Sequence, residues 1–292
     1  MDSPGSPKKV RTLQREITGL ATSDGAGVKL LRSLGNDQYA RLDPFLMLDE
    51  FSSDNPGDYI AGFPPHPHRG FDTVTYILDG TMRHEDHMGN VGHIKSGGVQ
   101  WMTAGRGVIH SEMPEQVDGR LRGFQLWINL PGCEKMKPAE YRDIQPTQIP
   151  VINTTAGAVI KVIAGSITVE DKPANGPIQG MSTEPIYLDV TLPEQSQISF
   201  IVPEKHQAFV YVFEGQVQIG DNTVKIHRVG ILSEGETIEV RSVNQTARLL
   251  VLAGKPIGEP VVQLGPFVMN TRAEIEQAVL DYQQGTLTQV TN

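Results

Sequence analysis

Short apolar runs separated by turn-forming residues recur along almost the whole chain. In residues 73–78 (TVTYIL) β-branched and aromatic side chains follow one another, and Asp79-Gly80 comes directly after them. Similar runs occupy residues 100–103 and 123–130, where Trp127 and its alternating apolar neighbours are expected in the core. The second half repeats the pattern at residues 159–163, 186–190, 198–202, 209–213 and 249–253. Such residues favour strands, and Asp-Gly favours the tight turns between them, so the pattern predicts an all-β protein.

Helical spacing is convincing only near the C-terminal end. Thr271 followed by Glu274 has the form of a capping box, in which each residue satisfies a backbone donor of the other. Ile275 and Ala278 then begin an apolar pattern with helical period. Gly285 follows and favours the left-handed conformation that ends many helices. We therefore predict one short C-terminal helix.

A change in composition divides the chain into two parts. Four prolines and several charges interrupt residues 131–150, which predicts a linker and two domains, residues 1–140 and 141–292. A faint internal repeat agrees, because residues 74–80 (VTYILDG) resemble residues 210–215 (VYVFEG) with Tyr76 aligned on Tyr211. We therefore expect two similar β domains.

Composition and charge narrow the class of protein. The chain has 292 residues, 38% of them hydrophobic and 20% charged, which is typical of folded domains. Its formal net charge of -9 disfavours direct binding to nucleic acid. The start, MDSPGSPKKVRTL, has no apolar run like that of a signal peptide, and no stretch is long and apolar enough to cross a membrane. With Cys133 as the lone cysteine, a cytoplasmic protein is expected.

Two pairs of metal-binding side chains stand out against this background. His66 and His68 flank Pro67, and His110 and Glu112 flank Ser111. Residues two apart on a strand face the same side, so pairs on neighbouring strands would converge inside one barrel. Three imidazoles and a carboxylate suit iron, copper, nickel, zinc or manganese and leave coordination sites open. We predict a mononuclear metal centre, because such a cluster is hard to bury without a cation.

Other polar and aromatic residues permit more than one interpretation. His84, His87 and His93, together with Asp86, could bind a second metal. We expect a solvated hairpin loop instead, since no two of these histidines are spaced two apart. Asp72 could orient a ligand imidazole or merely cap a turn. Three residues near the predicted site, which could line a pocket, are expected to pack in the core: Trp101, Met102 and Phe124.

The predicted ligands have no counterparts in the second half of the chain. With the offset of 135 residues given by the repeat, His66 maps to Ile201 and His68 to Pro203. His110 and Glu112 map near residues 245–247, where no ligand occurs. The repeat therefore predicts one domain with a metal and one without.

Several longer stretches resemble the pirin family of the cupin superfamily. They are residues 42–45 (LDPF), 63–71 (FPPHPHRGF), 100–107 (QWMTAGRG), 110–112 (HSE) and 265–271 (GPFVMNT). The resemblance implies two tandem cupin (double-stranded β-helix or jelly-roll) barrels and the short C-terminal helix. It also implies a non-haem iron in the first barrel, held by the residues here numbered His66, His68, His110 and Glu112. Asp72 departs from the glutamate usual in cupins, but pirins take their carboxylate ligand from the later motif.

The resemblance implies two kinds of function. Some pirins resemble quercetin 2,3-dioxygenases, which open a flavonol ring with dioxygen and release carbon monoxide. Our first hypothesis is this activity, with Fe(II), or else copper, nickel or manganese, and with Glu112 as both ligand and catalytic base. The alternative is an iron-dependent redox-sensing regulator that binds a partner protein. We expect a cytoplasmic protein, nuclear as well in a eukaryote, and a monomer is compatible with two barrels that cover their own edges.

Overall fold

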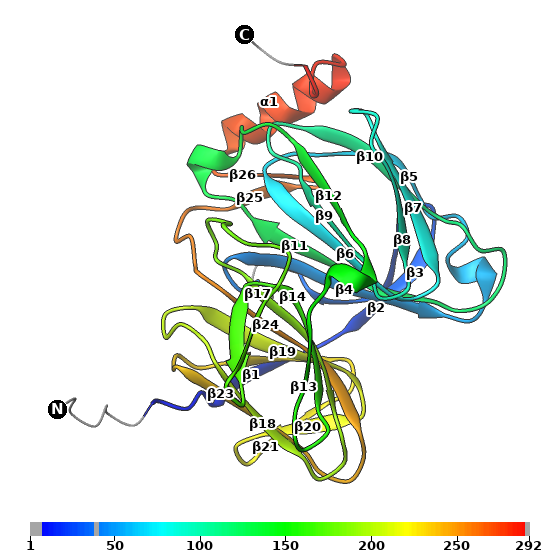
Figure 1. Ribbon diagram of the computed structural model, residues 1–292. Coiled ribbons are helices and arrows are strands. Elements are labelled where there is room, and N and C mark those ends of the chain that lie inside the picture. Colours follow the sequence, from blue (N-terminus) through cyan, green and yellow to red (C-terminus); the bar gives the residue numbers. More distant parts are fainter. Residues whose placement is uncertain (1–7, 38–40, 290–292) are drawn as a thin grey trace. The chain divides into compact units, whose positions relative to one another are not determined.

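Antiparallel strands make up most of the computed structural model, which describes residues 8–37 and 41–289 (Figure 1). These residues form two compact units, each with a larger and a smaller antiparallel sheet, as the expected cupin barrel requires. We call residues 20–146 and 257–289 the histidine barrel, and residues 8–19 and 147–256 the apolar barrel. The all-β prediction with two similar domains is thereby confirmed.

The histidine barrel contains a seven-stranded and a four-stranded sheet. The larger has the order β12 (Glu140–Ile144), β9 (Val99–Thr103), β6 (Phe71–Asp79), β11 (Leu121–Asn129), β4 (Phe45–Ser53), β3 (Val28–Leu34), β2 (Leu20–Asp24). The smaller has the order β5 (Phe63–His68), β10 (Val108–Pro114), β7 (Thr81–Asp86), β8 (Val91–Lys95). The unit also contains β25 (Val262–Leu264), β26 (Phe267–Met269) and the 3-10 turns η2 (Pro56–Asp58) and η3 (Gly132–Glu134).

The apolar barrel repeats this plan. Its larger sheet has the order β1 (Leu13–Thr18), β22 (Arg228–Leu232), β19 (Gln207–Glu214), β24 (Ala247–Gly254), β17 (Ile186–Leu192), β14 (Val159–Ala164), β13 (Val151–Asn153). Its smaller sheet has the order β18 (Gln197–Ile201), β23 (Thr237–Ser242), β20 (Gln216–Ile219), β21 (Asn222–Lys225). This part of the chain also contains a hairpin, formed by β15 (Ser166–Val169) and β16 (Lys172–Asn175), and the 3-10 turn η4 (Pro146–Gln148).

The faint sequence repeat corresponds to equivalent strands. β6 and β19 hold the third place in the larger sheet of each barrel, and the aligned Tyr76 and Tyr211 are both fully buried. Likewise β5 and β10 correspond to β18 and β23 in the smaller sheets. The offset of 135 residues between Tyr76 and Tyr211 therefore points to the strands equivalent to those of the histidines, which are β18 and β23.

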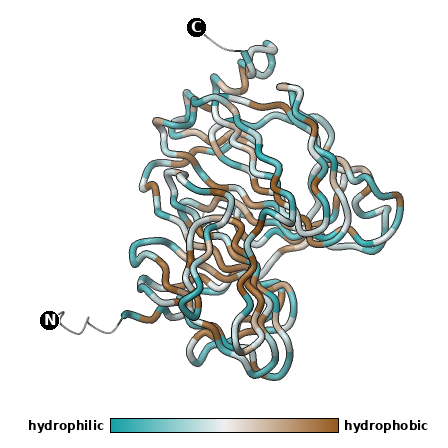
Figure 2. The backbone as a smooth tube through the Cα atoms, viewed as in Figure 1, coloured by the Kyte–Doolittle hydropathy of each residue, from teal (hydrophilic) through white to brown (hydrophobic). Residues whose placement is uncertain are grey.

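The interiors of the two barrels differ in polarity. In the apolar barrel Phe200 on β18 lies opposite Ile238 on β23, and both belong to one large hydrophobic core. Figure 2 shows apolar residues concentrated in the strands of this barrel. In the histidine barrel the corresponding strands place His66 opposite His110. The same architecture thus encloses a filled core in one unit and polar side chains in the other.

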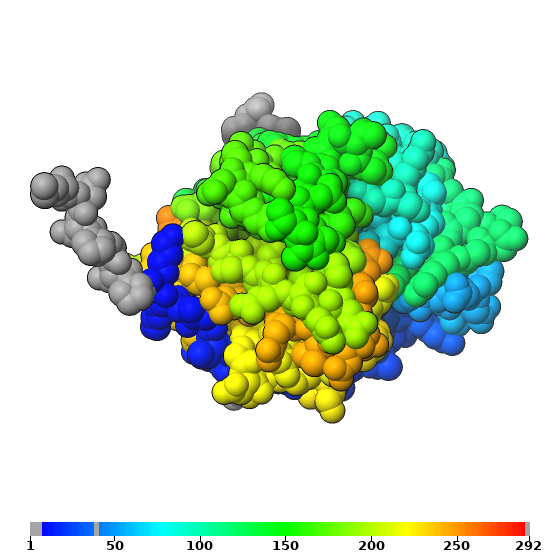
Figure 3. Space-filling view, turned by 60° about the horizontal axis from the view of Figure 1, so that its bottom comes forward, coloured from blue at the N-terminus to red at the C-terminus, as the bar shows by residue number. Residues whose placement is uncertain are grey.

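Each barrel takes in one end of the chain. β1 pairs with β22, with Leu13 opposite Leu232, so the N-terminal strand completes the apolar barrel. Figure 3 shows this blue segment against the yellow strands of the same unit. Residues 257–289 return to the histidine barrel. The predicted domain boundary at 140/141 lies close to residues 146/147, where the chain passes from the histidine barrel to the apolar barrel. One boundary does not separate the two units, however, because each contains two separate segments of the chain. Residues 1–7, which belong to the start of the sequence considered above, lie outside the described residues.

The predicted linker at 131–150 contains a real strand, which is a correction. β12 pairs with β9, with Ile144 opposite Val99, and forms the edge of the larger sheet. Pro138 and Pro146 lie just outside β12, so they remove no hydrogen bond from the ladder. Proline content alone therefore misled the interpretation of this segment.

The C-terminal helix agrees with its sequence signals. In α1 (Arg272–Gln283) the Glu274 amide donates to Thr271 Oγ1 at 3.3 Å, and the Thr271 amide donates to Glu274 Oε2 at 2.8 Å. Gly285 follows the last turn with φ +71°, which confirms its predicted role. Ile275 packs with apolar residues of β26. Across residues 8–37 and 41–289, no helix is long and apolar enough to cross a membrane.

Candidate metal centre

Three histidines meet inside the histidine barrel. His66 and His68 lie near the end of β5, and His110 lies on β10 directly opposite His66. One ring nitrogen from each lies within 4.8 Å of those of the other two. The ring centroids are 4.7 Å apart for His66 and His68 and 4.4 Å apart for His66 and His110. The same-face spacing of the first pair and the pairing of the two strands therefore bring these imidazoles together.

The environment of the rings fits a transition-metal ion. His110 Nε2 and His68 Nδ1 are buried without a hydrogen-bond partner. Burial lowers the pKa of both imidazoles, and the neighbouring histidines lower it further, so neutral rings with free lone pairs are favoured. His66 Nδ1 lies 2.8 Å from the carbonyl oxygen of Pro64, which directs its other nitrogen away from the backbone. Buried lone pairs without donors are costly, and a cation would satisfy them.

Glu112 borders the same space but stands apart from the three-histidine group. A register shift separates it from His110 along β10, and its side chain is buried. Oε1 accepts from Thr75 Oγ1 at 2.6 Å, and Oε2 accepts from Gln125 Nε2 at 3.0 Å. These two bonds fix the orientation of the carboxylate. Its assignment as the fourth ligand remains a prediction.

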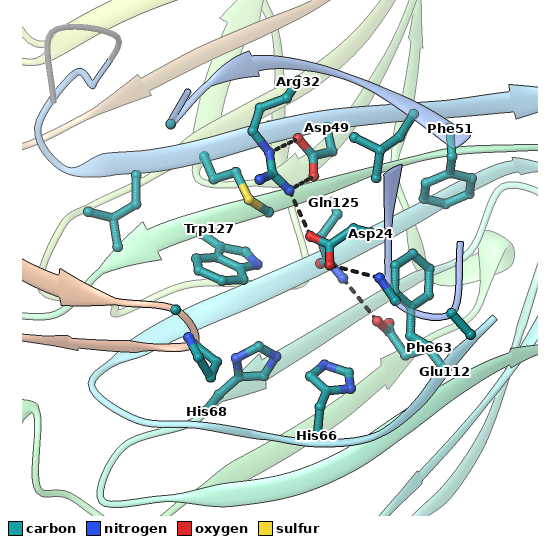
Figure 4. A pocket seen from close by; sticks show the side chains of 18 of the residues that line it. Asp24, Arg32, Asp49, Phe51, Phe63, His66, His68, Glu112, Gln125 and Trp127 are labelled. Atoms are coloured by element: carbon teal, nitrogen blue, oxygen red, sulfur yellow. Dashed lines mark hydrogen bonds and ion pairs between the residues drawn. The ribbon is translucent and has the colours of Figure 1, made fainter. Parts of the chain in front are cut away.

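A cavity of about 590 Å³ opens beside the histidines. His66, His68 and Glu112 lie at one end of it, with Trp127 and Phe63 among the wall residues (Figure 4). The volume of the cavity and its mixture of aromatic and polar lining residues suit a flat aromatic molecule with polar ends.

Trp127 was expected in the core, and this expectation is correct only in part, because one side of it packs against a hydrophobic cluster and it also borders the cavity. It is half-buried, it lines the cavity, and its ring lies edge-on to His68 with 5.3 Å between centroids. Gln125 and Trp127 of β11 border this cavity, and Trp127 also packs against Phe71 with 4.3 Å between ring centroids. The three other residues assigned to the core are buried there as expected: Trp101, Met102 and Phe124.

His84 is a second correction, because it is not in a solvated loop. It lies on β7 opposite Glu112 and is fully buried. Its Nδ1 is 3.3 Å from His110 Nδ1, and its Nε2 is 3.5 Å from Asp86 Oδ2. Its ring stacks on Tyr141 with 4.5 Å between centroids. Burial lowers the pKa of His84, partly offset by Glu112 and Asp86, so a neutral ring can accept the proton of His110 Nδ1–H.

The spacing of His84 and Asp86 was the missed signal. Residues two apart on β7 turn to the same side, and Met82 begins the same inward series. The other two histidines of this stretch are exposed, as expected of a hairpin: His87 lies beside the Ile109 amide and His93 pairs with Glu115.

We expect His84→Phe to weaken metal binding by about 10- to 100-fold, the usual effect of losing a hydrogen bond to a ligand imidazole. Phenylalanine keeps a ring against Tyr141 but cannot accept from His110. Competition with a chromophoric chelator measures the dissociation constant. His93→Phe, on the exposed edge of β8, is the control, and equal constants for both variants and the parent protein would contradict the role of His84.

Asp72 contacts neither a ligand histidine nor a turn. Its Oδ2 accepts from Trp101 Nε1 at 3.2 Å, and it also hydrogen-bonds Thr103, so it ties β6 to β9. Burial raises the pKa of Asp72 to about 6, although Thr103 and Lys137 act in the opposite direction. Asp72 therefore joins two neighbouring strands of the larger sheet. It neither orients a ligand imidazole nor caps a turn, which were the two roles considered from the sequence.

The turn after His68 is fixed by the C-terminal segment. Arg69 Nη1 pairs with Asp281 at 2.7 Å, Nη2 reaches the Leu287 carbonyl at 3.4 Å, and Nε donates to the Arg106 carbonyl. The Val268 amide donates to the Arg69 carbonyl at 3.0 Å. Residues far apart in the sequence therefore hold the strand that carries two of the histidines.

A buried lysine completes this support. Lys135 Nζ donates to the carbonyl oxygens of Gly70 at 2.8 Å and Val268 at 3.1 Å, and to Asn129 Oδ1 at 2.6 Å. The side chain is 1% exposed, and burial lowers its pKa to about 8. One ammonium group thus joins the turn after β5, the end of β11 and strand β26.

Comparisons with known proteins agree with this architecture. The sequence profile of Pirin matches residues 27–128, and that of the Pirin C-terminal cupin domain matches residues 187–288. A Pseudomonas aeruginosa protein, provisionally named a quercetin 2,3-dioxygenase, is 54% identical over 92% of this chain and 95% of its own. Human pirin is 39% identical over 95% of this chain and 93% of its own.

A solved structure is similar over nearly its whole length. The crystal structure of a quercetin 2,3-dioxygenase from Acinetobacter baumannii has a TM-score of 0.88 and 35% identity, and the match covers 96% of this chain and 99% of that one. Because both barrels match pirin profiles and the relatives align from end to end, this chain belongs to the pirin family.

Proposed function

We propose that this protein is a mononuclear metal-dependent dioxygenase that opens the ring of a flavonol such as quercetin. The observation that carries the proposal is the three-histidine cluster at the end of an aromatic-walled cavity of about 590 Å³. The names of the Pseudomonas and Acinetobacter relatives support the same reaction class. The products would be a depside and carbon monoxide, with both atoms of dioxygen incorporated.

The residues that would hold the metal are His66, His68, His110 and Glu112. We propose Fe(II), with copper, nickel and manganese as alternatives, since imidazole and carboxylate together suit all four. When bound, such an ion supplies a Lewis-acidic positive charge and one-electron chemistry toward dioxygen. His84 would keep His110 in the tautomer that leaves Nε2 free.

Glu112 is proposed as the base that accepts the proton of the flavonol 3-hydroxyl group. Its two hydrogen bonds, from Thr75 and Gln125, hold the carboxylate in place while leaving lone pairs on each oxygen. Trp127 and Phe63 offer flat faces to the substrate rings. Enclosure of the substrate excludes water and so favours transfer of the proton within the cavity.

An oxygen electrode tests the proposal directly. Protein stripped with a chelator and reloaded separately with Fe(II), Cu(II), Ni(II) or Mn(II) is mixed with quercetin under air. We expect saturable oxygen uptake with at least one metal, one dioxygen per quercetin consumed, release of carbon monoxide, and no uptake by the stripped protein. No uptake above the stripped control with any of the four metals would overturn the activity.

The same preparations also test the alternative function, a redox-sensing regulator. The similarity to human pirin is the reason for considering it. A redox-sensing protein would consume no oxygen with quercetin. It would instead bind a purified partner protein with an affinity that differs between the Fe(II)- and Fe(III)-loaded forms.

A further inference from the structure

The end of the cavity away from the histidines carries a second polar group that metal binding does not use. Figure 4 shows Arg32, Asp49 and Asp24 together across the cavity from His66 and His68. Arg32 donates from Nε and Nη2 to the two oxygens of Asp49, at 2.8 Å and 2.7 Å, and from Nη2 to Asp24 Oδ2 at 2.8 Å. We call Asp24, Arg32 and Asp49 the distal cluster.

The two carboxylates of the distal cluster have different roles. The Asp49 side chain is 3% exposed and forms a two-pronged pair with Arg32, so it positions the guanidinium. The Asp24 side chain is 52% exposed and borders the cavity. Asp24 Oδ1 accepts from the Gly25 amide at 2.7 Å and Oδ2 accepts from Arg32. Each carboxylate oxygen can accept two hydrogen bonds, so Asp24 retains capacity for a ligand.

The position of Asp24 is tied to the strand that carries the histidines. Asp24 ends β2, and the Ala26 amide in the following turn donates to the Gly62 carbonyl at 3.0 Å. Gly25 has φ +59°, and a Cβ there would lie 2.6 Å from both Gly62 and Phe63. The turn therefore packs tightly against the start of β5. Because β5 continues to His66, both ends of the cavity belong to one rigid frame.

The charge of the distal cluster selects the chemistry of its ligand. Two carboxylates and one guanidinium give a net charge of -1, which repels a carboxylate or phosphate. A neutral hydroxyl can donate to Asp24 and accept from the guanidinium of Arg32. A ligand that covers Asp24 without donating a hydrogen bond leaves a carboxylate stripped of water, and such mismatches discriminate strongly between ligands.

We propose that Asp24 and Arg32 form a subsite for a ring hydroxyl group of a planar polyphenol whose 3-hydroxyl group faces the histidines. This inference rests on the proposed function and narrows it, since it makes polyhydroxylated flavonols the substrate class rather than flavonols without ring hydroxyls. Trp127 and Phe63, which line the same cavity, would contact the aromatic body in between. The subsite sets specificity and takes no part in bond making.

Binding measurements without oxygen test the subsite. Iron-loaded protein under nitrogen is titrated with quercetin and with 3-hydroxyflavone, which keeps the 3-hydroxyl but lacks the ring hydroxyls, and quenching of tryptophan fluorescence gives each dissociation constant. We expect quercetin to bind at least about 10-fold more tightly, which corresponds to about 1.4 kcal/mol. Asp24→Ala should reduce this ratio about 10-fold and change the constant for 3-hydroxyflavone less than about 2-fold.

Two further variants make the result decisive. Asp24→Asn keeps the shape and one acceptor, so it should lose only part of the selectivity. Asp54→Ala removes an exposed carboxylate of the same barrel that does not line the cavity, and it should change nothing. An unchanged ratio in Asp24→Ala would overturn the subsite even if the protein oxidises quercetin. If neither flavonol binds the parent protein, both proposals are wrong, whereas selective binding without turnover rejects the dioxygenase alone.

Discussion

Replacing Glu112 with glutamine is expected to lower kcat/KM for quercetin by about 10³-fold, the middle of the range for loss of a general base. The Glu112 side chain is buried and fixed between Thr75 and Gln125, so its carboxylate is held in one orientation beside the histidines. Glutamine has almost the same shape but presents an amide to Gln125 and carries no charge. Oxygen uptake measured against quercetin concentration gives kcat and KM for both proteins.

The control for this variant lies just beyond the same strand. Glu115 follows β10 and pairs with His93 in a partly exposed position, so Glu115→Gln should retain full activity. Metal content measured on each preparation separates the two proposed roles of Glu112. Loss of turnover with metal retained supports the base, and loss of both supports the ligand. Full turnover by Glu112→Gln would contradict the assignment of this residue.

Replacing Lys135 with methionine is expected to lower the free energy of unfolding of the histidine barrel by about 3 kcal/mol. The variant leaves the acceptors on Gly70, Asn129 and Val268 without their donor in a buried site. Each buried acceptor left without a partner costs about 1 to 3 kcal/mol, and release of the buried charge offsets part of that cost. Denaturant unfolding followed by fluorescence gives the difference.

The pH dependence of this difference follows from the pKa of Lys135. The native value of about 8 lies below the usual 10.5, so between these pH values the unfolded chain binds more protons at this site than the native chain. Stability contributed by Lys135 therefore rises as pH increases from about 8 to 10, and the gap between parent and Lys135→Met should widen over that window. Lys137→Met, which removes a partly exposed pair with Glu134, should cost less than about 1 kcal/mol at each pH. Equal stability of the parent and Lys135→Met at pH 8 would contradict the prediction.

Spacing along single strands was the most informative signal in the sequence. The i, i+2 pairs predicted which histidines share a face, and strand pairing then places His66 beside His110. The helix cap was equally accessible, because Thr271 and Glu274 interact within one turn. Both predictions depend on neighbours only a few residues apart, where local geometry decides the outcome.

The features of the fold and of the candidate site that could not be predicted from the sequence depend on packing between distant segments. His84 faces the metal centre only because β7 pairs with β10, and no local pattern distinguishes an occupied barrel interior from a hollow one at Trp127. β12 was missed because prolines flank it, although Pro138 and Pro146 lie just outside the strand and leave its pairing with β9 intact. Arg69 and Lys135 each have a partner more than a hundred residues away in the C-terminal segment, Asp281 for Arg69 and Val268 for Lys135.

The return of residues 257–289 to the histidine barrel has a consequence for biosynthesis. Domains emerging from the ribosome generally begin to fold from the N-terminal side. Here the turn after His68 cannot form its hydrogen bonds to Val268, Asp281 and Leu287 until these residues have been translated, which happens only after the entire apolar barrel. The nascent first barrel therefore stays incomplete while the second is made, and binding of the proposed metal becomes a step that follows synthesis of these C-terminal residues.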